Sequence, residues 1–137
     1  MYERLLVAVD GSEQSARALE RAAGLAGLAH SSVRVVHVRE HIVVRGASWY
    51  LEEEEDAQAL VEHALESLRK GGVEASGAVL HALQGKAAAV ICDAANDADA
   101  DLIVMGSRGR GDLGGFLLGS VAHRVIHLSR QPVLVTR

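Results

Sequence analysis

The sequence predicts an α/β protein with one open parallel sheet of five strands and helices on both faces. Two observations carry this prediction: strand-like and helix-like apolar patterns alternate along the chain, and each change falls at a cluster of Gly, Asp or Ser. Such alternation is typical of parallel sheets with helical crossovers. The length of 137 residues and the hydrophobic content of 49% fit a single domain, residues 1–137, with one core.

The expected strands are short apolar runs. Residues 5–9 are apolar throughout, as in a central strand buried on both faces. Residues 73–83 are interrupted by Glu74, Ser76 and His81, which indicates an edge strand. In chain order, the five expected strands cover residues 5–9, 33–38, 73–83, 102–105 and 132–136.

Four helices are expected between the strands, over residues 12–29, 57–70, 85–96 and 120–128. Ser12 is the expected N-cap of the first. The second has the clearest apolar pattern, with steps of three and four residues from Ala57 to Leu68, and we interpret the acidic run 52–56 before it as a solvated helix start. Residues 39–51 show no clear period and are expected to form a loop.

Composition excludes several classes of protein. Cys92 is the only cysteine, so a disulfide scaffold and a cysteine-rich zinc fold are excluded, and we expect this thiol to be buried. No apolar run reaches the length of a membrane span and no targeting signal is found, so we expect a soluble, cytoplasmic protein. Only two lysines and 3% aromatic residues argue against nucleic acid as a partner.

Charge is distributed unevenly along the chain. The residues from Gly106 onward hold five arginines and one aspartate, a net charge of +4. Since the whole chain has a net charge of −4, the preceding 105 residues have a net charge of −8. A small polyanion is therefore expected to bind near the C-terminal quarter.

A glycine-rich segment follows the fourth expected strand: residues 106–119 contain six of the 14 glycines. Glycine allows successive main-chain N–H groups to turn toward an anion, and the start of the next helix adds more such donors. The pattern Gly109-x-Gly111-x-x-Gly114 has dinucleotide-binding spacing, but no acidic residue follows Asp112 to hold a ribose, which argues against a nicotinamide or flavin site. A P-loop is excluded because Val121 follows Ser120 and the required lysine is missing.

A longer pattern resembles the universal stress protein family. It comprises Gly106-x-x-Gly109, nine residues and then Gly119-Ser120, together with the segment VAVDGS at residues 7–12 and PVLV at residues 132–135. These signals occur in the family's order, and the resemblance covers essentially the whole chain. It implies a universal stress protein domain with strand order 3-2-1-4-5, in which the first and fourth strands are neighbours where the winding reverses.

The resemblance also implies a binding site for ATP, or for AMP or a cyclic nucleotide, with Mg²⁺ or Mn²⁺ accompanying the nucleotide. The implied site residues are Ala8, Val9 and Asp10 for adenine and ribose, Val38 for the adenine edge, Met105, Gly106, Arg108 and Gly109 for the ribose and first phosphates, and Gly119, Ser120, Val121 and Ala122 for the outer phosphates. ATP-binding members usually have Ser or Thr where Ala122 stands, and Glu is frequent where His123 stands. Loss of one donor to a charged group costs about 1.5–3 kcal/mol, so we expect weaker binding rather than none.

Three functions remain open. The first is an ATP-binding homodimer of stress response or signalling, with at most slow hydrolysis because no residue resembles a base positioned for water attack. The second is a family member with weak or lost nucleotide binding that acts through an unknown protein partner, which Ala122 favours. The third is an adenylate-using enzyme, although the glycine segment lacks a lysine or other obvious catalytic group.

Other residues have structural interpretations beside functional ones. Asp10 could cap the turn that follows it instead of holding a ligand, and His37 is expected to be a packed histidine beside the adenine pocket. His123 and His127 are interpreted as a surface or interface pair rather than a metal site.

The last expected strand is an apolar sheet edge, at Val133, Leu134 and Val135. The family resemblance implies that two such strands pair about a two-fold axis and form a homodimer.

Overall fold

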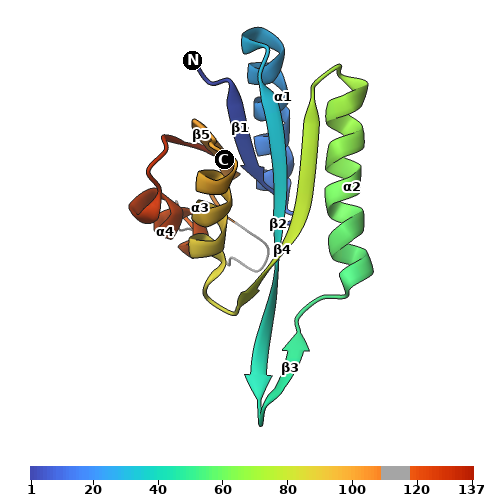
Figure 1. Cartoon of the computed structure of the whole chain (residues 1–137), viewed down its shortest axis with the longest axis vertical. Helices are drawn as coiled ribbons and strands as arrows, with labels where there is room; N and C mark the ends of the chain where they lie inside the picture. The colour runs from blue at the N-terminus through green and yellow to red at the C-terminus, as the bar shows by residue number, and fades with distance from the viewer. Residues whose placement is uncertain (109–117) are drawn as a thin grey trace.

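The computed structural model describes residues 1–108 and 118–137 and has an α/β fold of the predicted class (Figure 1). The sheet has six strands, one more than predicted. In chain order the elements are β1 (Arg4–Ala8), α1 (Glu13–Ala29), β2 (Ser32–Val44), β3 (Ala47–Tyr50), α2 (Glu54–Lys70), β4 (Ala75–Leu83), α3 (Ala87–Asp97), β5 (Leu102–Gly106), α4 (Ser120–Leu128) and β6 (Val133–Thr136).

The parallel strands pair in the predicted spatial order. β1 lies between β2 and β5, β4 pairs with the other side of β2, and β6 pairs with β5. The winding therefore reverses between β1 and β5, where Ala8 pairs with Met105 at the carboxyl ends of both strands. Ligands of open α/β sheets bind at such a reversal.

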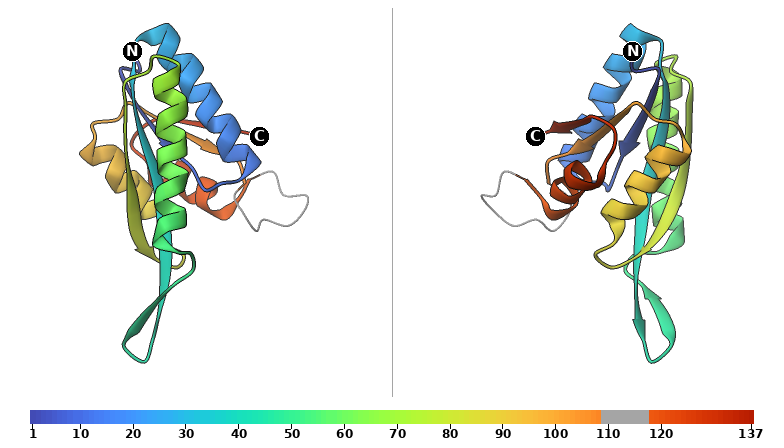
Figure 2. Two further views of the ribbon diagram at one scale, coloured as in Figure 1. Left: turned by 90° about the vertical axis from the view of Figure 1, so that its right-hand side faces the viewer. Right: turned by 60° about the vertical axis from the view of Figure 1, so that its left-hand side comes forward.

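Residues 39–51 do not form the expected loop. β2 continues to Val44, turns at Arg45 and Gly46, whose φ angles are 51° and 78°, and returns as the antiparallel strand β3. Two adjacent residues with positive φ are typical of tight hairpin turns. The hairpin projects beyond the rest of the sheet (Figures 1 and 2), and the side chains of Val43 and Trp49 are 54% and 61% exposed. Because solvent reaches both faces there, the sequence shows no alternation of apolar and polar residues.

Helices cover both faces of the sheet (Figure 2). Leu5 and Val7 of β1 pack in one core cluster with α1 and α2, whereas Leu6, between them, packs in a second cluster with α3 and α4. The alternation follows from the two-residue period of a strand. It explains why β1 is apolar at each of these positions.

The N-cap of α1 and the acidic start of α2 agree with the predictions. Ser12 is the N-cap of α1, and its side chain accepts a hydrogen bond from the Ser15 N–H at 3.1 Å. The helix α2 begins at Glu54 with acidic residues in its first turn, and Gly71 is its C-cap.

Cys92 is buried on α3, as predicted, with 6% of its surface exposed. Burial raises the pKa of its thiol above the ordinary value of 9.0, and the charge of Asp93 adds to this. A thiol in this environment is expected to be unreactive at neutral pH.

No helix within the described parts of the chain is both long and apolar enough to cross a membrane.

Candidate functional site

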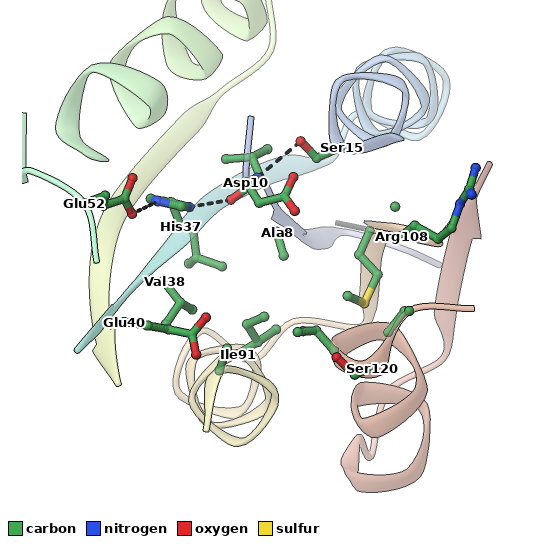
Figure 3. A pocket seen from close by; sticks show the side chains of 18 of the residues that line it. Ala8, Asp10, Ser15, His37, Val38, Glu40, Glu52, Ile91, Arg108 and Ser120 are labelled. Carbon is green, nitrogen blue, oxygen red and sulfur yellow. Dashed lines mark hydrogen bonds and ion pairs between the residues drawn. The ribbon is translucent and has the colours of Figure 1, made fainter. Parts of the chain in front are cut away.

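A pocket of about 860 Å³ lies at the carboxyl ends of β1 and β5 and beside the middle of β2 (Figure 3). Its volume falls in the usual range of small-molecule sites, roughly 300–1,000 Å³. Gly109 lies outside the described residues. The other predicted site residues all line this one pocket: Ala8, Val9, Asp10, Val38, Met105, Gly106, Arg108, Gly119, Ser120, Val121 and Ala122.

Asp10 is the second residue after β1, at the turn into α1. Its carboxylate oxygen Oδ1 accepts hydrogen bonds from the N–H and the hydroxyl of Ser12 at 2.9 and 2.5 Å, and its own N–H donates to the Ser15 hydroxyl at 3.2 Å. Gly11, with a φ of 82°, provides the backbone conformation of this turn. Asp10 thus caps the turn, as the alternative interpretation states, and it also lines the pocket. The two roles are compatible because a carboxylate has two oxygens, each of which accepts more than one hydrogen bond.

The main chain of Val38 lies at a gap in the β1–β2 ladder. Along this ladder the Ser32 N–H donates to the Glu3 carbonyl and the Val9 N–H to the Val36 carbonyl, both at 2.9 Å. The same register would next join the Val38 N–H to the Val9 carbonyl. The structure shows no such bond within residues 1–108 and 118–137, and pairing on this side of β2 resumes only where the Leu51 N–H donates to the Glu40 carbonyl at 3.1 Å. The N–H and C=O of Val38 are therefore left facing the pocket.

His37 donates to the carbonyl that the ladder would have used. Its ring is buried, with 6% exposure; Nδ1 donates to the Val9 carbonyl at 2.7 Å, and Nε2 pairs with the carboxylate of Glu52. Figure 3 shows the His37 ring facing the Glu52 carboxylate. The prediction of a packed histidine is confirmed, and its partners are now defined.

Glu52 was not predicted as part of the site. The interpretation of the run 52–56 as solvated is wrong for this residue, whose side chain is 23% exposed and paired with His37. The Arg39 Nε also donates to the Glu52 carbonyl at 3.0 Å, which fixes the segment between β3 and α2. Residues 53–56 are exposed, as expected. No local pattern could distinguish Glu52, because its partner is 15 residues away in the sequence.

The opposite end of the pocket is built from the start of α4. Gly119 is the N-cap, and the first bond inside the helix runs from the His123 N–H to the Gly119 carbonyl at 2.9 Å. The N–H groups of Ser120, Val121 and Ala122 therefore have no partner within the helix, and the helix dipole makes this end favourable for an anion. Arg108 lines the same pocket and adds a positive charge.

Ala122 has two environments. It lines the pocket, yet only 2% of its surface is exposed, and it packs with Val125 in the core cluster beneath α3 and α4. The rings of His123 and His127, whose centroids are 4.6 Å apart, lie on the exposed side of the same helix. Among the residues that the structure describes, no three His, Cys, Asp or Glu side chains are grouped to hold a metal ion.

An open, mostly parallel sheet with a pocket where its winding reverses defines a Rossmann-like α/β protein. The model of the universal stress protein family matches residues 1–137. The universal stress protein YxiE of Bacillus subtilis (strain 168) is 34% identical over 151 aligned residues, which cover 100% of both chains. The chain therefore belongs to the universal stress protein family.

Two solved structures of the family are similar to this chain. The universal stress protein from Archaeoglobus fulgidus in complex with dAMP is 29% identical, with a TM-score of 0.74 over 99% of this chain and 98% of that one. A universal stress protein in complex with cAMP is 24% identical, with a TM-score of 0.74 over 99% of this chain and 97% of that one, and shows likeness of the fold alone.

Proposed function

We propose that this protein binds ATP, or AMP or a cyclic adenine nucleotide, in the pocket between β1 and β5. The observation that carries the proposal is that a base-binding end and an anion-binding end occur in one pocket. Ala8, Val38 and Ile91 lie at one end, and Ser120 and Arg108 at the other (Figure 3). The dAMP complex of the similar structure from Archaeoglobus fulgidus supports an adenine nucleotide as the ligand.

The base end fits adenine in shape and polarity. Apolar side chains provide a surface for a purine face, and Val38 offers an N–H donor beside a carbonyl acceptor. Adenine has the complementary pair, the ring nitrogen N1 as acceptor and the amino group N6 as donor. Asp10, at the end of β1, is then placed for the ribose hydroxyls.

The phosphate end would hold the nucleotide through the main-chain N–H groups of Ser120, Val121 and Ala122, the Ser120 hydroxyl and Arg108. Mg²⁺ or Mn²⁺ fits this arrangement as part of the bound nucleotide, because Mg²⁺ is commonly held by phosphates, water and one or two carboxylates. Asp10 is the residue proposed to approach it. The ion would neutralise phosphate charge.

Hydrolysis is proposed to be slow at most. The pocket carboxylates Glu40 and Glu52 lie on the β2 side, away from Ser120 and Arg108 (Figure 3), and Glu53 and Asp56 follow Glu52 at the start of α2. Asp10 is assigned to the ribose, so none of the five is proposed as a base that activates water at an outer phosphate. A cytoplasmic role in stress response or signalling is part of the proposal.

The ligand can be identified directly. Protein purified without added nucleotide should release an adenine nucleotide on denaturation, detected by mass spectrometry in the supernatant. If a wash removes it, saturation with an equimolar mixture of ATP, AMP, cAMP and GTP, followed by gel filtration, should retain adenine nucleotides in preference to GTP. Retention of GTP to the same extent would contradict the adenine assignment.

A second candidate function is supported by Ala122. Because alanine supplies no hydroxyl at the phosphate end, the protein could bind nucleotide weakly and act through a protein partner. Triphosphate affinity separates this candidate from the first.

Replacing Ala122 with serine is expected to tighten ATP binding by up to about tenfold, since the new hydroxyl can donate to a phosphate. Affinity for adenosine, which lacks phosphates, should change little, and calorimetry of both ligands measures the difference. Equal gains for ATP and adenosine would show that the hydroxyl does not act on the phosphates. A fall in melting temperature would report the cost of a hydroxyl beside Val125.

The assembly that we propose is a homodimer through β6. This strand lies at the edge of the sheet beside β5, and Leu134 is 37% exposed there. An apolar edge strand favours pairing with a second copy. Replacing Leu134 and Val135 with lysine should give a monomer in multi-angle light scattering. The control, Leu28→Lys in α1, changes an apolar side chain that is 84% exposed and should leave a dimer. An unmodified protein that is monomeric at tens of micromolar would contradict the proposal.

A further inference from the structure

We infer that the buried pair His37–Glu52 is a positioning element that keeps the main chain of Val38 available to a purine base. The role in base recognition rests on the proposed function, whereas the effect of His37 and Glu52 on the main chain of Val38 does not. It assigns a role at the site to two residues that lie outside the implied set of binding residues.

The Val38 N–H and the His37 imidazole are both potential donors to the Val9 carbonyl. In an unbroken ladder, that carbonyl and the Val38 N–H would satisfy each other, and β1 would continue to shield this edge of β2. Closing the ladder is the default, because an unpaired main-chain group in a partly buried place is costly. The imidazole of His37 donates from Nδ1 to the Val9 carbonyl at 2.7 Å. Because a carbonyl oxygen can accept two hydrogen bonds, the ring opposes closure by holding this carbonyl toward itself and not by filling its only acceptor position.

The imidazole of His37 is held at both of its ring nitrogens. A carbonyl can only accept, so Nδ1 carries a proton, and Nε2 faces the carboxylate of Glu52. With both nitrogens engaged, the ring cannot rotate away without losing two hydrogen bonds. Glu52 is fixed in turn, because the Arg39 Nε donates to its main-chain carbonyl at 3.0 Å.

The position of the Val38 main chain suits recognition of a purine base. The freed N–H and C=O of Val38 lie between two points where β2 is paired, at the Val9 N–H and the Leu51 N–H. The gap therefore has a fixed position, and it presents one donor and one acceptor to the pocket. A base with an acceptor next to an amino group fits it, and the fit depends on His37 although His37 need not touch the base.

The test compares His37→Leu, which removes the donor, with His37→Asn, whose side-chain amide can still donate from nearly the position of Nδ1. In the protein without nucleotide, amide exchange of the Val38 N–H is measured by NMR. His37→Leu should slow this exchange at least about tenfold, because the amide then bonds to the Val9 carbonyl. His37→Asn should stay close to the unmodified protein, and Glu52→Ala should shift toward His37→Leu.

The second readout is base selectivity, given as the ratio of dissociation constants for 1-deaza-ATP, which lacks the N1 acceptor, and ATP. The unmodified protein and His37→Asn should prefer ATP by roughly three- to tenfold, and His37→Leu and Glu52→Ala should lose this preference. The ratio for adenosine and ATP should stay constant, because it reports the phosphate end. Glu54→Gln, a change in the same acidic run at an exposed position, is the matched control and should alter neither readout.

Unchanged Val38 exchange in both His37→Leu and Glu52→Ala overturns the inference. Slowed exchange with an unchanged selectivity ratio overturns the role in base recognition. If the unmodified protein binds no nucleotide, the proposed function fails, while the exchange measurement still decides whether His37 and Glu52 position Val38. Should His37→Leu not fold, the comparison of Glu52→Ala with His37→Asn and Glu54→Gln decides both points.

Discussion

Replacing Gly106 with alanine is expected to lower the free energy of unfolding by about 1–3 kcal/mol, the usual cost of overpacking a filled site. A Cβ at this position would lie 2.7 Å from the Cβ and 2.8 Å from the carbonyl carbon of Gln14, and 3.0 Å from the Ser15 nitrogen. The start of α1 would have to move. Gln14 is also held by β6, since the Thr136 hydroxyl donates to its carbonyl at 3.1 Å.

The displacement should also reach the pocket. The Ser15 hydroxyl accepts the hydrogen bond of the Asp10 N–H, so a shift of α1 would disturb the turn that holds the Asp10 carboxylate. Urea denaturation measures the stability, and calorimetry measures the affinity for ATP. Gly24→Ala, in the middle of α1 with nothing within 4 Å of the added Cβ, is the matched control and should stabilise by roughly 0.5–1 kcal/mol. Equal stability changes for both variants would contradict the close approach of β5 to α1.

Replacing Asp10 with alanine is expected to lower the affinity for ATP, AMP and adenosine alike, by roughly ten- to a hundredfold, when the titrations are made without divalent ions. The reason is the loss of a charged acceptor for the ribose hydroxyls, which the three ligands share. The loss should be much smaller for 2′,3′-dideoxy-ATP, which has no hydroxyl for Asp10 to accept from. Calorimetric titrations of both proteins with both triphosphates give the four dissociation constants.

The control for Asp10 must separate the turn from the ligand. Ser12→Ala removes the hydroxyl that bonds to Asp10 and that caps α1 at the Ser15 N–H, so it should cost about 0.5–2 kcal/mol of stability. It should nevertheless preserve the preference for ATP over dideoxy-ATP. If Asp10→Ala also preserved that preference, Asp10 would act only on the turn.

The parts of the fold that could be predicted are those where burial gives each strand a uniform character. β1 and β5 are enclosed by helices on both faces, so their apolar runs identify them, and turns rich in Gly, Asp and Ser separate them from the helices. The order of the parallel strands came from the family resemblance, and the register then brings Ala8 and Met105 together at the pocket.

The features that could not be predicted depend on contacts between distant residues. The β2–β3 hairpin has no alternating pattern because both of its faces meet solvent. Glu52 is one of five consecutive acidic residues in the sequence, and only the folded chain brings it to His37. The gap at Val38 lies where β1 ends beside β2 and where His37 bonds to the Val9 carbonyl, so it depends on strand register and on a contact between residues 28 positions apart in the sequence.

The most direct test of the central claim is a calorimetric titration of the unmodified protein with ATP in the presence of Mg²⁺. The bound base, ribose and phosphates would then each meet a described part of the pocket: Val38, Asp10 and the start of α4. We predict one site per chain, with a dissociation constant between micromolar and sub-millimolar and clearly weaker binding of GTP. Absence of both heat and thermal shift at saturating ATP would contradict nucleotide binding in this pocket. It would favour the second candidate function, in which the protein acts through a protein partner.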